Sequence, residues 1–466
     1  MLDMICIVIK GKTRKKWNCT AIPLWYWKIQ TSEVKMRFFK AHKLAQSRLS
    51  AQRHSSTVIM PLVSLVAAII LSACHTPVNN ISGQLAVSKA SINSSLSKNI
   101  VLKHKGKGFY AIPKMIVTKK GTALIVLQDR NGGDWGATID PLIIRSEDHG
   151  DTWSTPASIG AALDENGRFH VKPTSIVEDK VNGNILVFLA RSPIKDAKGE
   201  VIDERWFYTH LEESWALGRG FFMLSSKDDG KTWSEPVNIT SQLKRKAHWQ
   251  EWSPVHTGIQ IQRGQYAGRL VLPARAYTPK KGDDKLNWAY QSNGLIYSDD
   301  GGNTWHTSER SGDYFGEASI AELSDGAIYM NQRVANGPKE SRRHYAISRD
   351  GGATFSERGM HSDLFDVKNH AGIERVADPS GKEYLMFSNV PGPKKNSNRK
   401  GLTITLSDDD AKSWGKPKML EPSHASYSDL GMTQDGAFLL VYETGTKRAR
   451  KDIAVAKFTW SWLLNE

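Results

Sequence analysis

An eight-residue pattern that recurs along the chain constrains its fold more than any other feature. Five segments follow Ser-x-Asp-x-Gly-x-Thr-aromatic: Ser146–Trp153, Ser226–Trp233, Ser298–Trp305, Ser348–Phe355 and Ser407–Trp414. The last copy is degraded, with Ala411 in place of glycine and Ser413 in place of threonine. The closing aromatic residues are 80, 72, 50 and 59 residues apart, which leaves room for a four-stranded sheet and variable loops in each interval. The repeat therefore predicts an all-β chain built from similar units.

Each copy of the pattern is predicted to be a hairpin turn. The aspartate accepts hydrogen bonds from nearby backbone amides, as in Asx turns. The glycine supplies a positive φ angle, and the aromatic residue folds back between strands. Apolar runs such as Phe221–Leu224 and Leu402–Leu406 flank the copies and are typical of strands.

The N-terminal region has the pattern of an export signal. Val58–Ala73 is an apolar run of 16 residues, shorter than the ~20 that span a membrane. Basic residues precede it and small residues end it, which predicts a secretory signal. Residues 71–74 (Leu-Ser-Ala-Cys) resemble the lipobox of bacterial lipoproteins, in which the cysteine, here Cys74, is lipidated. A plain signal peptide and a buried helix are the alternatives, and a translation start at Met36 or Met60 also fits the pattern.

Charge and cysteine content exclude several classes of protein. The chain of 466 residues has a net charge of +15, but residues 1–73 carry 12 Lys/Arg and only 2 Asp/Glu, so the remainder is close to +5. A nucleic-acid-binding protein would concentrate basic charge on its folded part, so we expect no nucleic acid partner. The cysteines are Cys6, Cys19 and Cys74, which leaves the mature chain without a disulfide pair or a zinc-type spacing. A phosphate-binding glycine-rich loop is also absent, and we expect no cofactor or metal.

The five repeats resemble the Asp-boxes of the sialidase superfamily over roughly residues 100–466. The resemblance implies a six-bladed β-propeller of four-stranded antiparallel blades, with the boxes on the outer rim and away from the central site. Sialidases cleave terminal sialic acids, whose carboxylate lies on the anomeric carbon and would repel a carboxylate nucleophile. The family instead uses a neutral tyrosine activated by a glutamate. Arginines grip the substrate carboxylate through their planar fork.

Two segments match the family's nucleophile and its base. Ala425–Leu430 (ASYSDL) follows the last box and makes Tyr427 the candidate nucleophile. Gly316–Ser319 (GEAS) makes Glu317 the candidate base that activates the phenol.

Further segments match the substrate-binding arginines and the general acid. The resemblance assigns the carboxylate to Arg333 and Arg399, and hydroxyl groups of the sugar to Arg130. Asp134, in Gln128–Gly136 (QDRNGGDWG), is the candidate general acid/base. Asp140 takes that role if the loop aligns differently.

The chain departs from the family pattern at one position. Sialidases open the first blade with Tyr/Phe-Arg-Ile-Pro, whose arginine is the first of three that bind the carboxylate, but this chain has Ala111 in that place. Glu443 matches the glutamate that pairs with the missing arginine and should need another cation nearby. Lys107, Lys114 and Arg275 are the candidates. Three alternatives stay open: a sialidase with a substituted cation, a hydrolase of a deaminated or eight-carbon ulosonic acid, and an inactive propeller that binds glycans.

The sequence thus predicts three regions and one activity. Residues 1–73 are an N-terminal extension and lipoprotein signal, 74–98 a Ser- and Asn-rich tether, and 99–466 a catalytic propeller. Residues 193–220 exceed a simple hairpin and are either an insertion near the site or an ordinary surface loop. We expect a retaining exo-α-sialidase that is exported to the cell envelope and held by a lipid at its outer membrane or periplasmic face. Its expected partners are sialylated or related anionic glycans and the membrane, and we expect a monomer.

Overall fold

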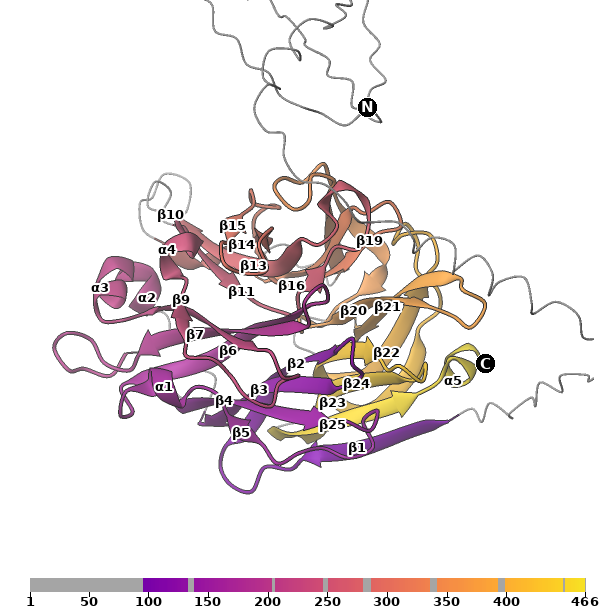
Figure 1. Cartoon of the computed structure of the whole chain (residues 1–466), viewed down its shortest axis with the longest axis horizontal. Helices are drawn as coiled ribbons and strands as arrows, with labels where there is room; N and C mark the ends of the chain where they lie inside the picture. Colours follow the sequence, from indigo (N-terminus) through magenta and orange to yellow (C-terminus); the bar gives the residue numbers. More distant parts are fainter. Residues whose placement is uncertain are drawn as a thin grey trace, which may run out of the picture. The chain divides into compact units, whose positions relative to one another are not determined.

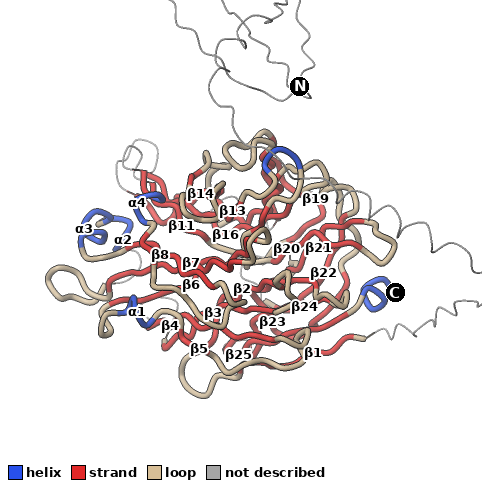
Figure 2. Tube along the Cα trace, in the orientation of Figure 1, coloured by secondary structure: helices blue, strands red, loops and turns tan. Residues whose placement is uncertain are grey.

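The fold is all-β over the part of the chain that the structure describes. The computed structural model describes residues 95–132, 138–202, 206–245, 250–279, 286–335, 342–392, 399–446 and 449–465. Strands dominate these ranges (Figures 1 and 2). The helical segments are short: α1 (Ala161–Asp164), α2 (Trp206–Thr209), α3 (Leu211–Ala216), α4 (Thr240–Leu243), α5 (Trp460–Leu464) and the 3-10 turn η2 (Gly264–Tyr266). Within the described ranges, none of the helices has the length and apolar character needed to cross a bilayer.

Three sheets have four antiparallel strands that follow one another in sequence. The first contains β2 (Phe109–Val117), β3 (Ala123–Asn131), β4 (Thr138–Ser146) and β5 (Ala157–Ser158). The second contains β6 (Phe169–Asp179), β7 (Asn184–Pro193), β8 (Gly220–Ser226) and β9 (Val237–Asn238). Another contains β16 (Phe315–Glu322), β17 (Ile328–Val334), β18 (Arg342–Ser348) and β19 (Glu357–Phe365). This consecutive antiparallel order makes each sheet one blade of a propeller-like arrangement.

Two larger sheets complete the arrangement. One contains β10 (Lys244–Arg245), β11 (Gln250–Pro254), β12 (Ile259–Gln260), β13 (Leu270–Pro279), β14 (Leu286–Ser298) and β15 (His306–Thr307). The other contains β20 (Gly372–Ala377), β21 (Glu383–Asn389), β22 (Lys400–Ser407), β23 (Lys418–Met432), β24 (Phe438–Thr446), β25 (Ala449–Phe458) and β1 (Leu96–Leu102). The first strand, β1, pairs with β25 near the C-terminus, with Leu96 opposite Phe458. Strand β1 therefore adds residues 96–102 to this sheet.

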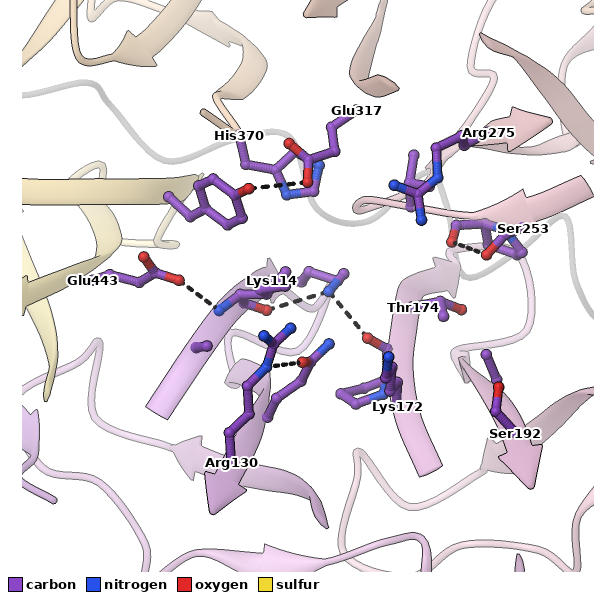
Figure 3. Close-up of a pocket in the computed structure, with 18 of the residues that line it drawn as sticks. Lys114, Arg130, Lys172, Thr174, Ser192, Ser253, Arg275, Glu317, His370 and Glu443 are labelled. Carbon is purple, nitrogen blue, oxygen red and sulfur yellow. Dashed lines mark hydrogen bonds between the residues drawn. The ribbon is translucent and has the colours of Figure 1, made fainter. Parts of the chain in front are cut away.

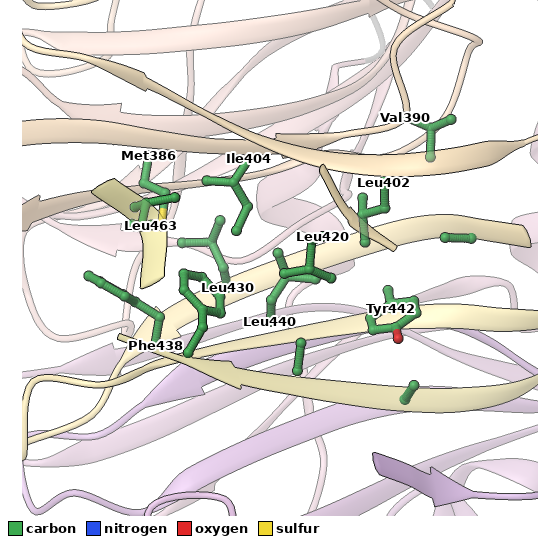
Figure 4. Close-up of a cluster of buried hydrophobic side chains, with 14 of the residues drawn as sticks. Met386, Val390, Leu402, Ile404, Leu420, Leu430, Phe438, Leu440, Tyr442 and Leu463 are labelled. Carbon is green, nitrogen blue, oxygen red and sulfur yellow. The ribbon is translucent and has the colours of Figure 1, made fainter. Parts of the chain in front are cut away.

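Apolar side chains fill the space between neighbouring sheets. Met115 and Ile125 of the first sheet pack with Leu439 and Val441 of β24. In the seven-stranded sheet, residues of β20–β22 pack on residues of β24 and β25, so its two ends face each other across a shared core (Figure 4). Each fully buried Leu or Phe in these layers contributes roughly 1.5–3 kcal/mol. The packing holds the strand ends that carry the site in fixed positions.

The five repeats form the predicted hairpin turns: the first four join the last two strands of their sheets, and the fifth joins β22 to β23 within the seven-stranded sheet. In the first, Asp148 Oδ1 accepts hydrogen bonds from Ser146 Oγ (2.8 Å) and from the backbone N–H of Thr152 (2.9 Å). A third hydrogen bond comes from the Thr152 hydroxyl to Asp148 Oδ2. The three bonds lower the pKa of Asp148 to about 2, and the one from the Thr152 hydroxyl has the largest effect. The same bonds recur around the second and fifth aspartates, Asp228 and Asp409. The prediction of Asx-type turns is confirmed.

The glycines of the first four repeats are expected to tolerate alanine to a degree that depends on their neighbours. Gly352 has φ 102°, and a Cβ there would lie 3.4 Å from its nearest neighbour. Gly352→Ala should therefore lower the free energy of unfolding only by the strain of a left-handed backbone, about 1–2 kcal/mol. Gly150 has φ 86°, and its Cβ would lie 2.5 Å from Leu439, which adds an overpacking cost of about 1–3 kcal/mol. Urea denaturation of the two variants measures the difference, and equal losses would contradict this account.

A buried histidine away from the strand ends gives the fold a pH dependence. His361 lies against Tyr329, whose hydroxyl is 2.7 Å from its Nε2, and burial lowers the pKa of His361 to about 4. The unfolded chain takes up this proton near pH 6.5, so the native state loses stability as the pH falls from 6.5 towards 4. The free energy of unfolding of the wild type should therefore fall by up to about 3 kcal/mol relative to that of His361→Gln over that interval. Parallel unfolding free energies of the two proteins from pH 7.5 to 4.5 would contradict the prediction.

Candidate active site

A cavity of about 690 Å³ opens between strands of all five sheets. Residues of β2, β6, β11, β16 and β23 line it (Figure 3). Its volume is within the range of small-molecule sites, and its lining is rich in polar and charged side chains. The cavity brings together most of the candidate residues that the sequence singled out.

Irregular pairing in the lining strands aims side chains into this cavity. A β-bulge breaks the alternation of a strand and reorients the residues around it. The strand register shifts at four places beside the cavity: between Ala111 and Lys114, Pro173 and Ser175, Phe315 and Ala318, and Ala425 and Ser428. The last two intervals contain Glu317 and Tyr427. Both candidates therefore lie in bulged segments rather than in regular strand.

Tyr427 and Glu317 are in direct contact, as the sequence predicted. The Tyr427 hydroxyl donates to Glu317 Oε1 at 3.1 Å. Arg333 Nη1 donates to the same hydroxyl at 3.0 Å and also to Glu317 Oε2. The phenol oxygen thus loses electron density to a guanidinium while its proton faces a carboxylate. This arrangement favours removal of the phenol proton.

Nearby charges lower the pKa of Tyr427. Burial of the phenol raises its pKa, but the positive charges of Arg333 and Arg399 outweigh burial, and the pKa lies below the usual value of 10.0. The Arg399 guanidinium lies 4.9 Å from the centre of the tyrosine ring. Arg399 is fixed by hydrogen bonds of 2.8 Å to Ser426 Oγ and to the backbone oxygen of Lys368. The two predicted carboxylate-binding arginines therefore flank the tyrosine.

The first sheet supplies the arginine predicted to bind the sugar hydroxyls. Arg130, near the end of β3, lines the cavity and donates through Nε to Gln128 Oε1 at 2.7 Å. Asp134 lies outside the described residues, as does Cys74. The alternative acid, Asp140, is an exposed residue of β4 that accepts a 2.5 Å hydrogen bond from Ser158 Oγ and is not among the residues that line the cavity. Asp140 lies on the third strand of its sheet, and its carboxylate is bonded to a residue of the outermost strand.

Glu443 and Lys114 bind the backbone of β2 close to Ala111. Ala111 lines the cavity, and Glu443 accepts a 2.9 Å hydrogen bond from the backbone N–H of Ile112, whose φ is 53°. Lys114 is fully buried on the same strand and donates to the backbone oxygens of Ile112 and Pro173 at 3.2 Å each. Burial lowers the pKa of Lys114 to about 7, against the opposing charges of Asp429 and Glu443.

All three cations suggested as replacements for the missing arginine line the cavity. They are Lys107, Lys114 and Arg275. Lys114 lies on the same strand as Ala111, and the charge of Glu443 raises the pKa of Lys114 against the larger effect of burial.

The sequence analysis did not identify a group of buried polar residues that packs against Tyr427. The His370 ring packs edge-on against Tyr427 with ring centres 5.2 Å apart, and His256 packs edge-on against His370 at 4.4 Å. Burial lowers the pKa of His256 to about 3 and that of His370 well below 6.5, so both rings are neutral. Burial raises the pKa of Asp429 to about 7. Only Asp429 had a sequence signal, because it lies two residues after Tyr427 in the segment Ala425–Leu430.

The insertion at 193–220 contributes to the cavity. Phe207 of α2 and Arg219, just before β8, both line it. Arg219 lies 4.6 Å above the Phe207 ring and donates to Ser192 Oγ at 2.9 Å. The prediction of an insertion near the site is therefore correct, and its alternative, an ordinary surface loop, is wrong.

Comparison with known proteins decides the family. The BNR repeat-like domain matches residues 206–440, half of the chain. The chain belongs to the BNR repeat-like domain family. It is a β-propeller of the sialidase type, as the repeats predicted.

Relatives of this family are similar along most of the chain. A sialidase of Micromonospora viridifaciens is 29% identical over 367 residues, covering 76% of this chain and 52% of that protein. A sialidase of Bacteroides fragilis is 27% identical over 351 residues, covering 72% and 60%. The chain therefore spans little more than half the length of these relatives. The structure of a Hadza microbial sialidase, Hz136, has a TM-score of 0.62 at 24% identity and covers 76% of this chain and 66% of that one.

Proposed function

We propose that this protein is a retaining exo-glycosidase that removes terminal α-ketosidically linked sialic acid from glycoconjugates. The hydrogen-bonded group of Tyr427, Glu317 and Arg333 carries the proposal, because a tyrosine with a packing role alone would need neither a carboxylate nor a guanidinium at its hydroxyl in an open cavity. Curated relatives named sialidase support the substrate class.

The mechanism assigns one task to each group. Glu317 takes the phenol proton as the Tyr427 oxygen attacks the anomeric carbon, and the bond to the leaving oxygen breaks as Asp134 protonates it. Arg333 and Arg399 hold the substrate carboxylate, and their charges stabilise the developing phenolate. Water, which loses a proton to Asp134, then attacks the same carbon from the side that the aglycone left, and the bond to the Tyr427 oxygen breaks as Glu317 returns the proton to the phenolate. Two displacements at one carbon give net retention.

Turnover of three ketosides tests this function and its alternatives. Purified protein would be offered fluorogenic α-ketosides of N-acetylneuraminic acid, of its deaminated analogue and of the eight-carbon ulosonic acid. We expect hydrolysis of the first, with NMR detecting the α-anomer as the initial product. Faster hydrolysis of the second or third ketoside would make a related ulosonic acid the substrate. This is the second candidate because Ala111 replaces an arginine of the family pattern that binds the sialic acid carboxylate. Glycan binding without turnover of any ketoside would instead indicate a binding propeller.

We also propose that the propeller has six blades. β23 pairs with β22 through its first half and with β24 through its second half. The side chains of the two ends of this sheet pack against each other. Division of β23 at Ala425 turns the seven-stranded sheet into two four-stranded blades that share one strand, β1 completing the last.

Attachment to the cell envelope is proposed from the sequence pattern around Cys74. Cys74→Ser should move the protein from the membrane fraction to the soluble fraction of the exporting cell and abolish incorporation of labelled palmitate. Ser72→Thr, which keeps the cysteine, is the control. Membrane retention of the Cys74→Ser protein would contradict the lipid anchor.

A further inference from the structure

The loop between β19 and β20 is buried, although it is rich in polar residues. Residues 366–370 follow β19, and none of the five is more than 6% exposed. Connecting segments normally run over the surface, because their backbone groups need hydrogen-bond partners. Three of the five side chains are ionisable, and burial of such groups costs free energy unless they are bonded. The buried loop, as we name residues 366–370, therefore needs specific contacts that hold it in place.

Arg343 of β18 fixes the buried loop. Its side chain is fully buried, and its Nη1 donates to Asp366 Oδ2 at 3.3 Å and to the backbone oxygen of Asn369 at 3.1 Å. The Lys368 ammonium donates to the backbone oxygen of Ala335 at 2.7 Å. Since the loss of water offsets most of the attraction in a buried ion pair, the chief effect of Arg343 is to fix the position of the loop.

Asn369 of the buried loop binds the irregular segment that carries Tyr427. Its Nδ2 donates to the backbone oxygen of Ser426 at 3.2 Å. Ser426 lies where the pairing of β23 with β24 shifts register, between Ala425 and Ser428. A bulge takes backbone groups out of the ladder of strand hydrogen bonds, so another group must bind them if the strand is to keep one shape. Asn369 supplies such a bond to the residue directly before Tyr427.

The two neighbours of Asn369 contact other parts of the candidate active site. The backbone oxygen of Lys368 accepts a 2.8 Å hydrogen bond from Arg399. The His370 ring packs edge-on against Tyr427, with ring centres 5.2 Å apart. The side-chain amide of Asn369 can therefore be removed by substitution without deleting either of these contacts.

We propose that Asn369 is a positioning residue for Tyr427 and acts through its hydrogen bond to the backbone of the bulge. This inference rests on the proposed function for the role of Tyr427 as nucleophile. Tyr427 contacts Glu317 and Arg333 through hydrogen bonds of 3.1 and 3.0 Å, which a displacement of about 1 Å would break. Asn369 is not among the described residues that line the cavity, so its effect on the reaction passes through Tyr427.

The separate effects of Asn369→Ala on kcat and KM test this role. The variant loses the bond to Ser426, and we expect kcat for the ketoside that the wild type prefers to fall about 10- to 100-fold, because a small displacement of a reacting group has an effect of this size. KM should stay within about threefold, since both carboxylate-binding arginines remain. Asn293 of β14 is equally buried and lies outside the described lining of the cavity, so Asn293→Ala should keep kcat within about twofold.

A spectroscopic measurement on Tyr427 needs no turnover. Full-length protein grown with 3-fluorotyrosine gives fluorine NMR signals from its tyrosines, and the signal that Tyr427→Phe removes belongs to Tyr427. Its chemical shift against pH gives the pKa of the phenol, which Asn369→Ala should raise because the hydroxyl moves away from the positive charges of Arg333 and Arg399. Asn293→Ala should leave this pKa unchanged. The same spectra give the folded fraction, so kcat is expressed per folded molecule.

Asn369→Asp keeps the size of the side chain and replaces the alanine variant if that protein does not fold. An ionised aspartate cannot donate to the Ser426 oxygen and repels it. At pH 8 we therefore expect kcat of Asn369→Asp to fall by about 10-fold or more, again with KM within about threefold.

Three results would overturn the positioning role. They are wild-type values of both kcat and the Tyr427 pKa in folded Asn369→Ala, equal losses of kcat in Asn369→Ala and Asn293→Ala, and a rise in KM of more than about tenfold at unchanged kcat. The last would assign Asn369 to substrate binding through Arg399. In each case hydrolysis by the unmutated protein would leave the proposed function intact. A raised Tyr427 pKa in Asn369→Ala, combined with no hydrolysis by the unmutated protein, would support the positioning role and refute the proposed function.

Discussion

Tyr427→Phe should lower kcat for ketoside hydrolysis by at least about 10³-fold, because removal of a nucleophile leaves only binding and electrostatic stabilisation. The substitution deletes one oxygen that donates to Glu317 and accepts from Arg333. The ring keeps its packing against His370, so the fold should survive. Initial rates with the fluorogenic ketoside that the wild type prefers measure the effect.

A second tyrosine in the same sheet provides the matched control. Tyr442 of β24 is buried, and its hydroxyl donates to Glu421 at 3.3 Å, away from the residues that line the cavity. Tyr442→Phe should leave kcat within twofold and cost about 1 kcal/mol of stability through the lost hydrogen bond. Equal rates of Tyr427→Phe and Tyr442→Phe would refute Tyr427 as the nucleophile.

A covalent adduct offers a direct view of the same step. A fluorinated ulosonic acid substrate that slows the second displacement should leave its sugar acid on the peptide that contains Tyr427. Mass spectrometry of digested protein locates the added mass. An adduct on Glu317 instead would make the carboxylate, which accepts the phenol proton in our mechanism, the nucleophile.

The repeats made most of the fold predictable from the sequence. Their serine, aspartate and glycine positions specify a local turn, and local turns depend on few distant residues. Even the degraded copy keeps the turn, since Ala411 adopts φ 65° where the others have glycine. The long strand β23 was less predictable, because its change of partner at Ala425 depends on packing between distant strands rather than on local pattern.

The candidate site was also only partly predictable from the sequence. Tyr427, Glu317, Arg333 and Arg399 were found because each lies in a short segment that resembles a family motif. His370 and His256 lie in no such segment and meet Tyr427 only through the packing of three sheets.

Ala111→Arg should bind the substrate carboxylate more tightly and lower KM for the N-acetylneuraminic acid ketoside. Ala111 lines the cavity beside the bulge of β2, and Glu443 lies within reach of the same segment through Ile112. A new guanidinium there gains a carboxylate partner in Glu443 and a second one in the substrate. One charge-assisted hydrogen bond contributes about 1.5–3 kcal/mol, so we expect KM to fall by about 10- to 100-fold.

Ala111→Met separates charge from volume at this position. Methionine has a long side chain without a charge, so it should raise KM or leave it unchanged. A fall in KM for both variants would mean that filling the cavity, rather than a third cation, improves binding. A rise in KM for Ala111→Arg would contradict our placement of the substrate carboxylate beside Glu443.

The Lys114 amine makes the comparison of wild type with Ala111→Arg sensitive to pH. Wild-type Lys114 has a pKa of about 7, and a guanidinium nearby would lower that value further by repulsion. Above neutral pH Lys114 loses its charge in wild type, and its contribution to substrate binding is lost with it. The guanidinium introduced by Ala111→Arg would stay charged, because guanidinium does not deprotonate in this range. The ratio of wild-type to variant KM should therefore increase from pH 6 to pH 8, and a ratio independent of pH would mean that Lys114 does not replace the missing arginine.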